Sequence, residues 1–351
     1  MTEKDNRAIA IWLLVCCAMI FAMVVLGGVT RLTGSGLSMV RWEPVTGIFP
    51  PMTQAEWQQE FAHYQASPEY QKINVGMDLA GFKQIYWFEF AHRLLGRAIG
   101  VVFLLPFLYF LLRRKIEKPF IPRLGLMFVL GGLQGLLGWY MVKSGLVDNP
   151  HVSQYRLTAH LAAAIVIYAY MFWVALDLLA ARQRSAPGGR HASLRPYALM
   201  TAGLIFLTIL SGGFVAGTKA GFAYNTFPLM DGRWIPDGLF ALSPLYRNLF
   251  ENIATVQFDH RLLATLTLIA VMAFWWTATR VPMARRARLA VHLLLAMVLI
   301  QVTLGISTLL LHVPVSLAAA HQAGALALFT LVLFASHALR PYETAAVEGA
   351  A

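Results

Sequence analysis

One short motif occurs twice in this chain, as Phe90-Ala91-His92-Arg93-Leu94-Leu95-Gly96 and again as Phe258-Asp259-His260-Arg261-Leu262-Leu263-Ala264. In each copy a histidine followed by an arginine stands at the start of a long apolar run. Each half then supplies a second histidine, in Ala159-His160-Leu161 and in Ala320-His321-Gln322. Because polar groups are costly inside a membrane, residues of this kind usually serve a function there. The chain is therefore a duplication built around two pairs of intramembrane histidines.

The composition is that of a polytopic membrane protein. Hydrophobic residues make up 58% of the chain and charged residues only 13%, far from the balance of a soluble domain. A helix needs about 20 mainly apolar residues to cross a membrane. Such stretches occupy residues 9–29, 86–112, 123–142, 157–180, 196–216, 254–279, 288–310 and 317–339. We predict an all-α integral membrane protein with eight transmembrane helices in two pseudo-symmetric four-helix bundles.

The net charge of +11 indicates membrane topology rather than nucleic-acid binding. Most lysines and arginines flank the apolar stretches on one side, which by the positive-inside rule is cytoplasmic. We therefore expect both termini in the cytoplasm. These flanking residues are Lys4, Arg7, Arg113, Arg114, Lys115, Lys118, Arg123, Arg182, Arg184, Arg190, Arg195, Arg280, Arg285, Arg286, Arg288 and Arg340.

The duplication also sets the domain organisation. Gly27-Gly28 matches Gly212-Gly213 in the first helix of each half, and Leu133–Gly138 matches Ile300–Gly305 in the third. We predict an N-terminal bundle over residues 1–181, a cytoplasmic linker over 182–195 and a C-terminal bundle over 196–351. Because each half has an even number of crossings, both halves enter the membrane in the same orientation, related by an axis along the membrane normal.

Two long connections lie on the outer side, over residues 30–85 and 217–253. Aromatic-bearing polar stretches predict short helices at 54–64 and 67–74, lying over the mouth of the first bundle. Cys16 and Cys17 are adjacent within the first apolar stretch, where they cannot bridge the outer loops. That stretch is longer than the apolar core of a typical secretory signal, so we expect a retained helix.

The four histidines of the repeats, His92, His160, His260 and His321, share one predicted depth. Each lies within about two turns of the outer end of a helix that runs inward, at 1.5 Å per residue. Two imidazoles facing each other across a helical bundle are a typical haem site. The pattern predicts haem between His92 and His160 and between His260 and His321, with zinc, copper or a proton relay left open. The remaining histidines are interpreted as packing or surface residues.

The halves differ beside these histidines. Glu89 stands three residues before His92, on the same helix face, whereas the matching residue before His260 is Gln257. A carboxylate beside one site and a neutral amide beside the other suggest one reactive half and one electron-carrying half. The alternative is that Glu89 only stabilises the start of its helix through the helix dipole.

The arginines that follow the histidines are candidate cofactor ligands. Arg93 and Arg261 lie near the aqueous edge, where a guanidinium can bind haem propionates through two hydrogen bonds. The alternative interpretation is that both side chains reach toward lipid phosphates.

These residues resemble the haem A synthase family over almost the whole chain. The resemblance is carried by Thr33-Gly34-Ser35-Gly36-Leu37-Ser38, Trp42-Glu43-Pro44-Val45-Thr46-Gly47, Phe88–Arg97, Gln134-Gly135-Leu136-Leu137-Gly138-Trp139 and Asn225-Thr226-Phe227-Pro228-Leu229-Met230. The long first loop without cysteines is similar to the alphaproteobacterial and mitochondrial branch of the family. In the other branch a pair of outer-loop cysteines takes part in function, so a thiol-based step is in doubt for this chain.

The resemblance implies oxidation of the C8 methyl of haem O, through successive hydroxylations, to the formyl group of haem A for terminal oxidases. Haem O, supplied by haem O synthase, would occupy the N-terminal half, with His92 and His160 near its iron and Glu89 as the acid/base or charge-stabilising group. Haem B would lie between His260 and His321 and pass electrons to a partner that the sequence does not identify. The expected surroundings are membrane lipids and no nucleic acid, with a homo-oligomer left open.

Two other classes of protein compete with this interpretation. A membrane cytochrome b for electron transfer only would also use paired histidines, but Glu89 and the large outer loop favour an enzyme. A secondary transporter with repeats is the other rival. It would not need four histidines at one depth, and the sequence has no obvious broken helices.

Overall fold

The computed structural model describes residues 3–43, 47–146, 150–180 and 190–340. Eight helices in this part are long and apolar enough to cross a membrane. They are α1 (Glu3–Leu32), α4 (Leu79–Leu112), α5 (Ile121–Gly145), α6 (Gln154–Ala180), α7 (Arg195–Thr218), α9 (Ile253–Thr279), α10 (Arg285–Leu310) and α11 (Val315–Ala338). The predicted class, an all-α integral membrane protein, is confirmed, and each predicted span falls within one of these helices to within a residue.

Short helices connect the long ones. They are α2 (Gln54–Gln65), α3 (Pro68–Lys72), α8 (Asn248–Glu251) and the 3-10 helices η1 (Lys118–Phe120), η2 (Arg190–Leu194), η3 (Ala220–Phe222) and η4 (Leu245–Arg247). The two helices predicted in the first outer loop are thus confirmed as α2 and α3. The predicted linker 182–195 lies mostly outside the described residues, which resume at Arg190, so the division into 1–181 and 196–351 stays a prediction.

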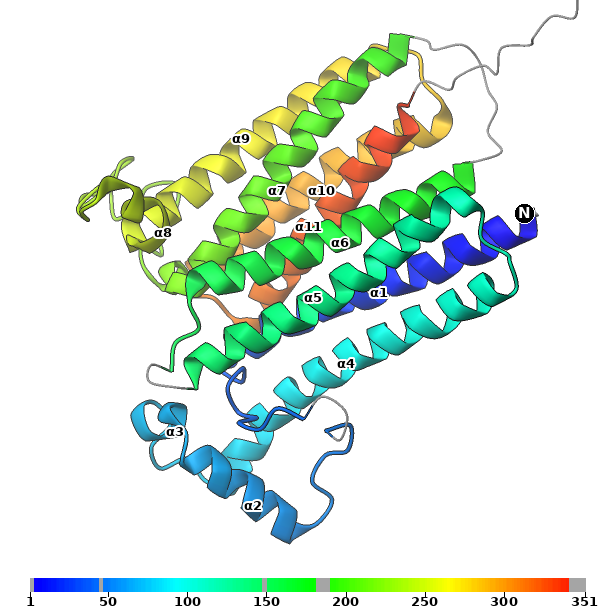
Figure 1. Cartoon of the computed structure of the whole chain (residues 1–351). Helices are drawn as coiled ribbons and strands as arrows, with labels where there is room; N and C mark the ends of the chain where they lie inside the picture. The colour runs from blue at the N-terminus through cyan, green and yellow to red at the C-terminus, as the bar shows by residue number, and fades with distance from the viewer. Residues whose placement is uncertain (1–2, 44–46, 147–149, 181–189, 341–351) are drawn as a thin grey trace, which may run out of the picture.

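The long helices run roughly along one direction, with α1 and α4–α6 grouped together and α7 and α9–α11 grouped beside them (Figure 1). Two long connections, from α1 to α4 and from α7 to α9, lie at the same end of the bundle, which we call the loop end. The N-terminus lies at the opposite end, here the terminal end (Figure 1). All four histidine-bearing helices, α4, α6, α9 and α11, start at the loop end.

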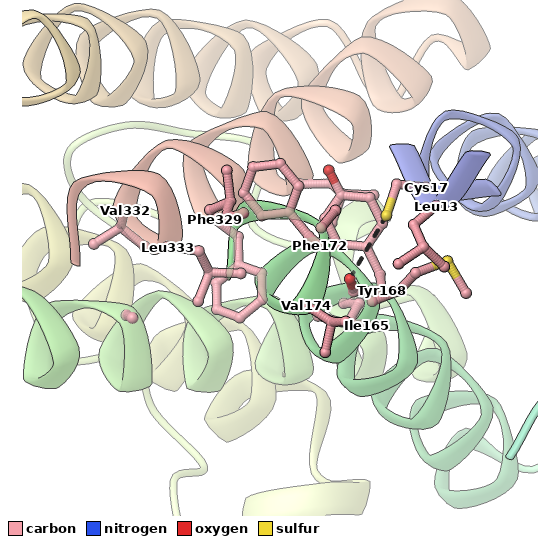
Figure 2. Close-up of a cluster of buried hydrophobic side chains, with 14 of the residues drawn as sticks. Leu13, Cys17, Ile165, Tyr168, Phe172, Val174, Phe329, Val332 and Leu333 are labelled. Atoms are coloured by element: carbon pink, nitrogen blue, oxygen red, sulfur yellow. Dashed lines mark hydrogen bonds between the residues drawn. The ribbon is translucent and has the colours of Figure 1, made fainter. Parts of the chain in front are cut away.

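The halves meet through α1, α6, α7 and α11, which pack on one another across the centre. Figure 2 shows part of this apolar cluster, where Cys17, Phe172 and Phe329 come from α1, α6 and α11. Tyr168 and Thr330 form a hydrogen bond of 2.8 Å between their hydroxyls, which joins α6 to α11. Both cysteines of the chain are free and buried within α1.

The start of α4 differs from the prediction. The helix begins at Leu79 rather than at residue 86, so His92 lies in its fourth turn and not within two turns of the helix start. Asp78 caps the helix by accepting a hydrogen bond from the Gly81 amide at 2.8 Å. The added turns are held because Phe82 and Tyr86 pack with Trp57 and Tyr64 of α2.

Polar contacts tie the two halves together at both ends of the bundle. Near the loop end, the Gln322 side chain of α11 donates a hydrogen bond of 2.7 Å to the Val24 carbonyl of α1. At the terminal end, Asp177 of α6 accepts a hydrogen bond from Arg340 at 2.5 Å and lies 2.9 Å from His337 Nε2 of α11. The relative placement of the four histidines is therefore fixed by direct contacts between the halves.

Candidate functional site

Each of the four repeat histidines packs against a glycine on a neighbouring helix of its own half. A Cβ built on Gly305 would lie 2.8 Å from His321 Cε1, closer than real side chains approach one another. The same construction gives 3.0 Å from Gly138 to His160 Cε1, 3.2 Å from Gly212 to His260 Cε1, and 3.1 Å from Gly27 to His92 Nε2. Gly27 and Gly212, which match in the repeat, thus make space for the imidazoles of His92 and His260.

The C-terminal pair has the geometry of a two-histidine metal site. The rings of His260 and His321 lie 6.5 Å apart between centroids and are inclined at 85° to each other. A metal–imidazole bond is about 2 Å long, so this separation leaves room for one ion bound by both rings. Among the described residues no three His, Cys, Asp or Glu side chains gather into a metal site. A cofactor that needs only two protein ligands, such as haem, fits this donor set better than tetrahedral zinc.

A glutamine of the preceding helix holds the second histidine of each half. Gln134 donates to the His160 carbonyl at 2.9 Å, and Gln301 donates to the His321 carbonyl at 2.9 Å. The side-chain oxygens of both glutamines are buried without a hydrogen-bond partner, and so is His321 Nδ1. These orphaned polar atoms beside the rings also fit a site that binds a further group.

The N-terminal pair is His92 of α4 and His160 of α6. The two imidazoles are close enough to interact electrostatically. Gln134 lies 3.2 Å from His160 Nδ1 in addition to its bond to the carbonyl. The structure thus brings together both predicted pairs, each within its own half.

Glu89 is buried, with 3% of its surface exposed, and each of its carboxylate oxygens accepts two hydrogen bonds. Oε2 accepts from the Ser38 hydroxyl and from the Met39 amide, both at 2.8 Å. Oε1 accepts from Arg93 Nε at 3.1 Å and Arg93 Nη2 at 2.5 Å. The carboxylate therefore fastens the loop after α1 to the helix that carries His92.

Arg93 extends this clamp. Besides Glu89, its guanidinium donates to the Met39 carbonyl at 2.8 Å and the Arg41 carbonyl at 3.0 Å, and it lies 5.3 Å from the centre of the Trp42 ring. These bonds use four of the five N–H donors of Arg93, so one hydrogen on Nη1 is left for a propionate. In this structure Arg93 anchors the loop and neutralises Glu89.

The C-terminal half repeats the clamp with uncharged partners. Gln257, also 3% exposed, donates to the carbonyls of Ala220 at 2.8 Å and Ala223 at 2.5 Å. Its oxygen accepts from Arg261 Nη2 at 3.1 Å, and the same arginine donates to the Tyr224 carbonyl at 2.7 Å. Arg261 Nε is buried without a partner, so this arginine keeps a donor for a bound anion.

Several residues of the site are not evident from the motifs alone. Ser38 and Ser211, which contact Glu89 and His260 at 2.8 Å, were not predicted. The sequence did contain a signal for the glutamine and glycine partners of the histidines, because their segments align within the repeat. These partners are Gln134 with Gly138 and Gln301 with Gly305. Residues of one half that recur at matched positions of the other half are therefore the best guide to this site.

Comparisons with a family model and with individual proteins point to the same family. Residues 10–333 match the COX15-CtaA family, described as cytochrome oxidase assembly protein. A protein of Nitrosospira multiformis named heme A synthase is 59% identical over 95% of this chain and 94% of its own length. Proteins named heme A synthase COX15 are 49% identical in Arabidopsis thaliana, over 96% of this chain and 76% of the relative, and 47% identical in Bos taurus, over 97% and 84%.

Proposed function

The chain belongs to the COX15-CtaA family of cytochrome oxidase assembly proteins, and we propose that it is a haem A synthase. In this function it is a membrane oxidoreductase that oxidises the C8 methyl of haem O to the formyl group of haem A by successive hydroxylations. The observation that carries the proposal is the unequal repeat: two histidine pairs in matched glycine-lined spaces, with Glu89 beside one and Gln257 beside the other.

The N-terminal half is the proposed substrate site. His92 and His160 would lie near or on the iron of haem O, below the loop that Glu89 and Arg93 hold in place. Glu89 is the proposed acid/base or charge-stabilising group. Its four hydrogen bonds support the second of these roles, because a carboxylate held by four donors, together with its paired arginine, keeps a fixed orientation without reorganisation.

The C-terminal half is the proposed cofactor site. His260 and His321 would hold haem B, and when bound this group would supply one-electron transfer. Arg261, through its unpartnered Nε, is the candidate partner of a propionate. Arg93 is the matching candidate in the substrate half, through its remaining Nη1 hydrogen.

The proposed location is a bacterial inner membrane, with both termini in the cytoplasm and both histidine pairs near the outer face. The clusters of lysine and arginine at the terminal end support this orientation. Haem O, delivered by haem O synthase, is the proposed substrate. An electron partner accepts the electrons that the oxidation of haem O releases. Membrane lipids surround the helices, and a homo-oligomer is left open.

The decisive experiment is mass analysis of the haem extracted from the purified protein after expression in cells that make haem O. We expect haem B together with farnesylated haem O, haem A or a partly oxidised intermediate. A His260→Ala variant should lose haem B and still contain the farnesylated haem. Haem B alone in every preparation would instead identify a bis-histidine cytochrome b that only carries electrons.

A further inference from the structure

The imidazole of His260 is held by the hydroxyl of Ser211, a partner that its counterpart lacks. Ser211 Oγ lies 2.8 Å from His260 Nδ1 and donates its hydrogen to the Thr208 carbonyl at 2.8 Å. The Thr208 hydroxyl lies 2.8 Å from the hydroxyl of Thr267, one helix away. Ser211 thus joins the ring to the α7 backbone at Thr208, whose own hydroxyl joins α7 to α9.

This arrangement selects one tautomer of the imidazole. Because the Ser211 hydrogen is directed to Thr208, the Ser211 oxygen is left to accept a proton from Nδ1 of His260. A histidine protonated on Nδ1 has its free lone pair on Nε2, the nitrogen that can bind a metal. A partner that holds the other ring nitrogen also fixes the ring orientation and makes the ligand more basic.

The matching positions of the N-terminal half are all apolar. Aligned through the two glycine pairs, Ser211 corresponds to Leu26 and Thr208 to Met23. Aligned through the histidine motif, Thr267 corresponds to Ile99. Over the residues that the structure describes, no hydrogen bond to a ring nitrogen of His92 is found.

The ring of His92 is also turned differently. His160, His260 and His321 all present Cε1 to their glycines, whereas His92 presents Nε2, at 3.1 Å from the Cβ position of Gly27. The nitrogen that would bind a metal therefore lies against the backbone of α1.

We propose that Ser211 is a positioning residue that makes His260 a permanently oriented axial ligand, whereas His92, without such a partner, is an exchangeable one. The proposal rests on the function proposed above. A resident electron carrier must keep its haem through every turnover, whereas a substrate haem must enter and leave. The Ser211 hydroxyl beside His260 and the apolar Leu26 at the matching position of the N-terminal half fit these two requirements.

The test compares Ser211→Ala with Ser211→Thr in the purified, haem-loaded protein. The readouts are the midpoint potential of haem B, its low-spin electron paramagnetic resonance signal, and its rate of transfer to excess apomyoglobin. Loss of a partner of this kind usually costs about 10-fold to 100-fold in metal affinity. We expect Ser211→Ala to raise the potential and speed haem loss about 10-fold or more, and Ser211→Thr to restore both.

Ser336→Ala is the matched control. Ser336 is a buried serine of α11 whose hydroxyl bonds only the Val332 carbonyl of its own helix, at 2.7 Å, so its removal should change neither readout. If Ser211→Ala keeps the wild-type potential and transfer rate, or if Ser336→Ala moves them equally, the proposal is overturned. If Ser211→Ala binds no haem at all while Ser211→Thr binds it normally, the proposal stands.

The reciprocal variant Leu26→Ser tests the substrate half. A hydroxyl at this position should hold His92 and slow exchange of the N-terminal haem, while the haem B potential stays unchanged. Faster or unaltered exchange would contradict the role given to the apolar surroundings. The haem B measurements do not depend on product formation, so failure of the synthase assignment and failure of this proposal give different results.

Discussion

Glu89 and Gln257 occupy matching positions and fasten the loops over the two histidine pairs. Glu89 accepts hydrogen bonds from its loop, whereas Gln257 donates them. In the N-terminal half, Glu89 accepts from the hydroxyl of Ser38 and the amide of Met39. In the C-terminal half, Gln257 donates to the carbonyls of Ala220 and Ala223. The exchange of glutamate for glutamine is therefore matched by an exchange of donors and acceptors in the loop, and a carboxylate–arginine pair fastens only the loop of the N-terminal half.

A second pair of buried residues repeats this difference. The first outer loop encloses Glu69, 6% exposed, which accepts a hydrogen bond from the Tyr64 hydroxyl at 3.3 Å. The second encloses Asn248, 0% exposed, which donates to the carbonyls of Leu242 and Leu245 at 2.8 and 3.0 Å. Buried carboxylates hold the first loop together, and buried amides hold the second. The two loops should therefore respond differently to mutation and to pH.

The largest effect is expected from Glu89→Gln. The amide nitrogen would face either Arg93 or the donors of Ser38 and Met39, so two hydrogen bonds are replaced by contacts between donors, and Arg93 loses its counter-charge. An acid/base group typically contributes 10²–10⁴-fold, and we expect haem A formation to fall within that range while haem B is retained. Haem O and haem A are measured by mass analysis of cell extracts.

The reciprocal change, Gln257→Glu, is the control for this comparison. It places a carboxylate against two carbonyls but beside Arg261, so it should loosen the second loop and alter the haem B site without abolishing haem A formation. Near-normal haem A from Glu89→Gln would show that the charged clamp is only a structural feature of the loop.

The next effect concerns the arginines of the two clamps. If Arg261 binds a propionate through its unpartnered Nε, Arg261→Ala removes a charge-assisted hydrogen bond of about 1.5–3 kcal/mol. Haem B should then be lost roughly ten to a hundred times faster, measured by transfer to apomyoglobin. Arg93→Ala, whose donors are bound to Glu89 and the loop, should leave haem B retention unchanged. Equal retention in both variants would favour the loop-anchor role for Arg261 as well.

A smaller effect is expected from filling a glycine space. In Gly305→Ala the new methyl would lie 2.8 Å from His321 Cε1, and overpacking of this kind costs about 1–3 kcal/mol. We expect a weakened low-spin haem B spectrum, because His321 must move. Gly203→Ala in α7 is the control, since a Cβ there meets nothing within 4 Å. An unchanged spectrum of Gly305→Ala would mean that the ring can shift without affecting the ligand.

The features that sequence predicted and those that it missed have different physical origins. The length of the apolar stretches predicted the eight spans, and the internal repeat predicted His92, His160, His260 and His321. Both are local properties of the sequence and need no knowledge of tertiary contacts. The partners of Glu89 and His260 could not be predicted, because Ser38 approaches its partner from 51 positions away and Ser211 from 49. The start of α4 was missed because Leu79–Tyr86 is held by α2 rather than by a membrane.

The smallest effect is a pH dependence confined to one loop. Burial raises the pKa of Glu69 to about 7, from 4.5. Between these values the folded loop keeps a proton that the unfolded chain has released, so its stability is greatest below about pH 4.5 and falls as the pH rises toward 7. Hydrogen exchange, corrected for the intrinsic rate, should show weaker protection of residues 54–73 near pH 8 than near pH 5. The loop around Asn248, whose buried amide does not titrate, should show no such change, and Glu69→Gln should make the first loop equally insensitive. Equal pH responses of both loops in the wild-type protein would mean that the charge difference at Glu69 and Asn248 has no energetic consequence.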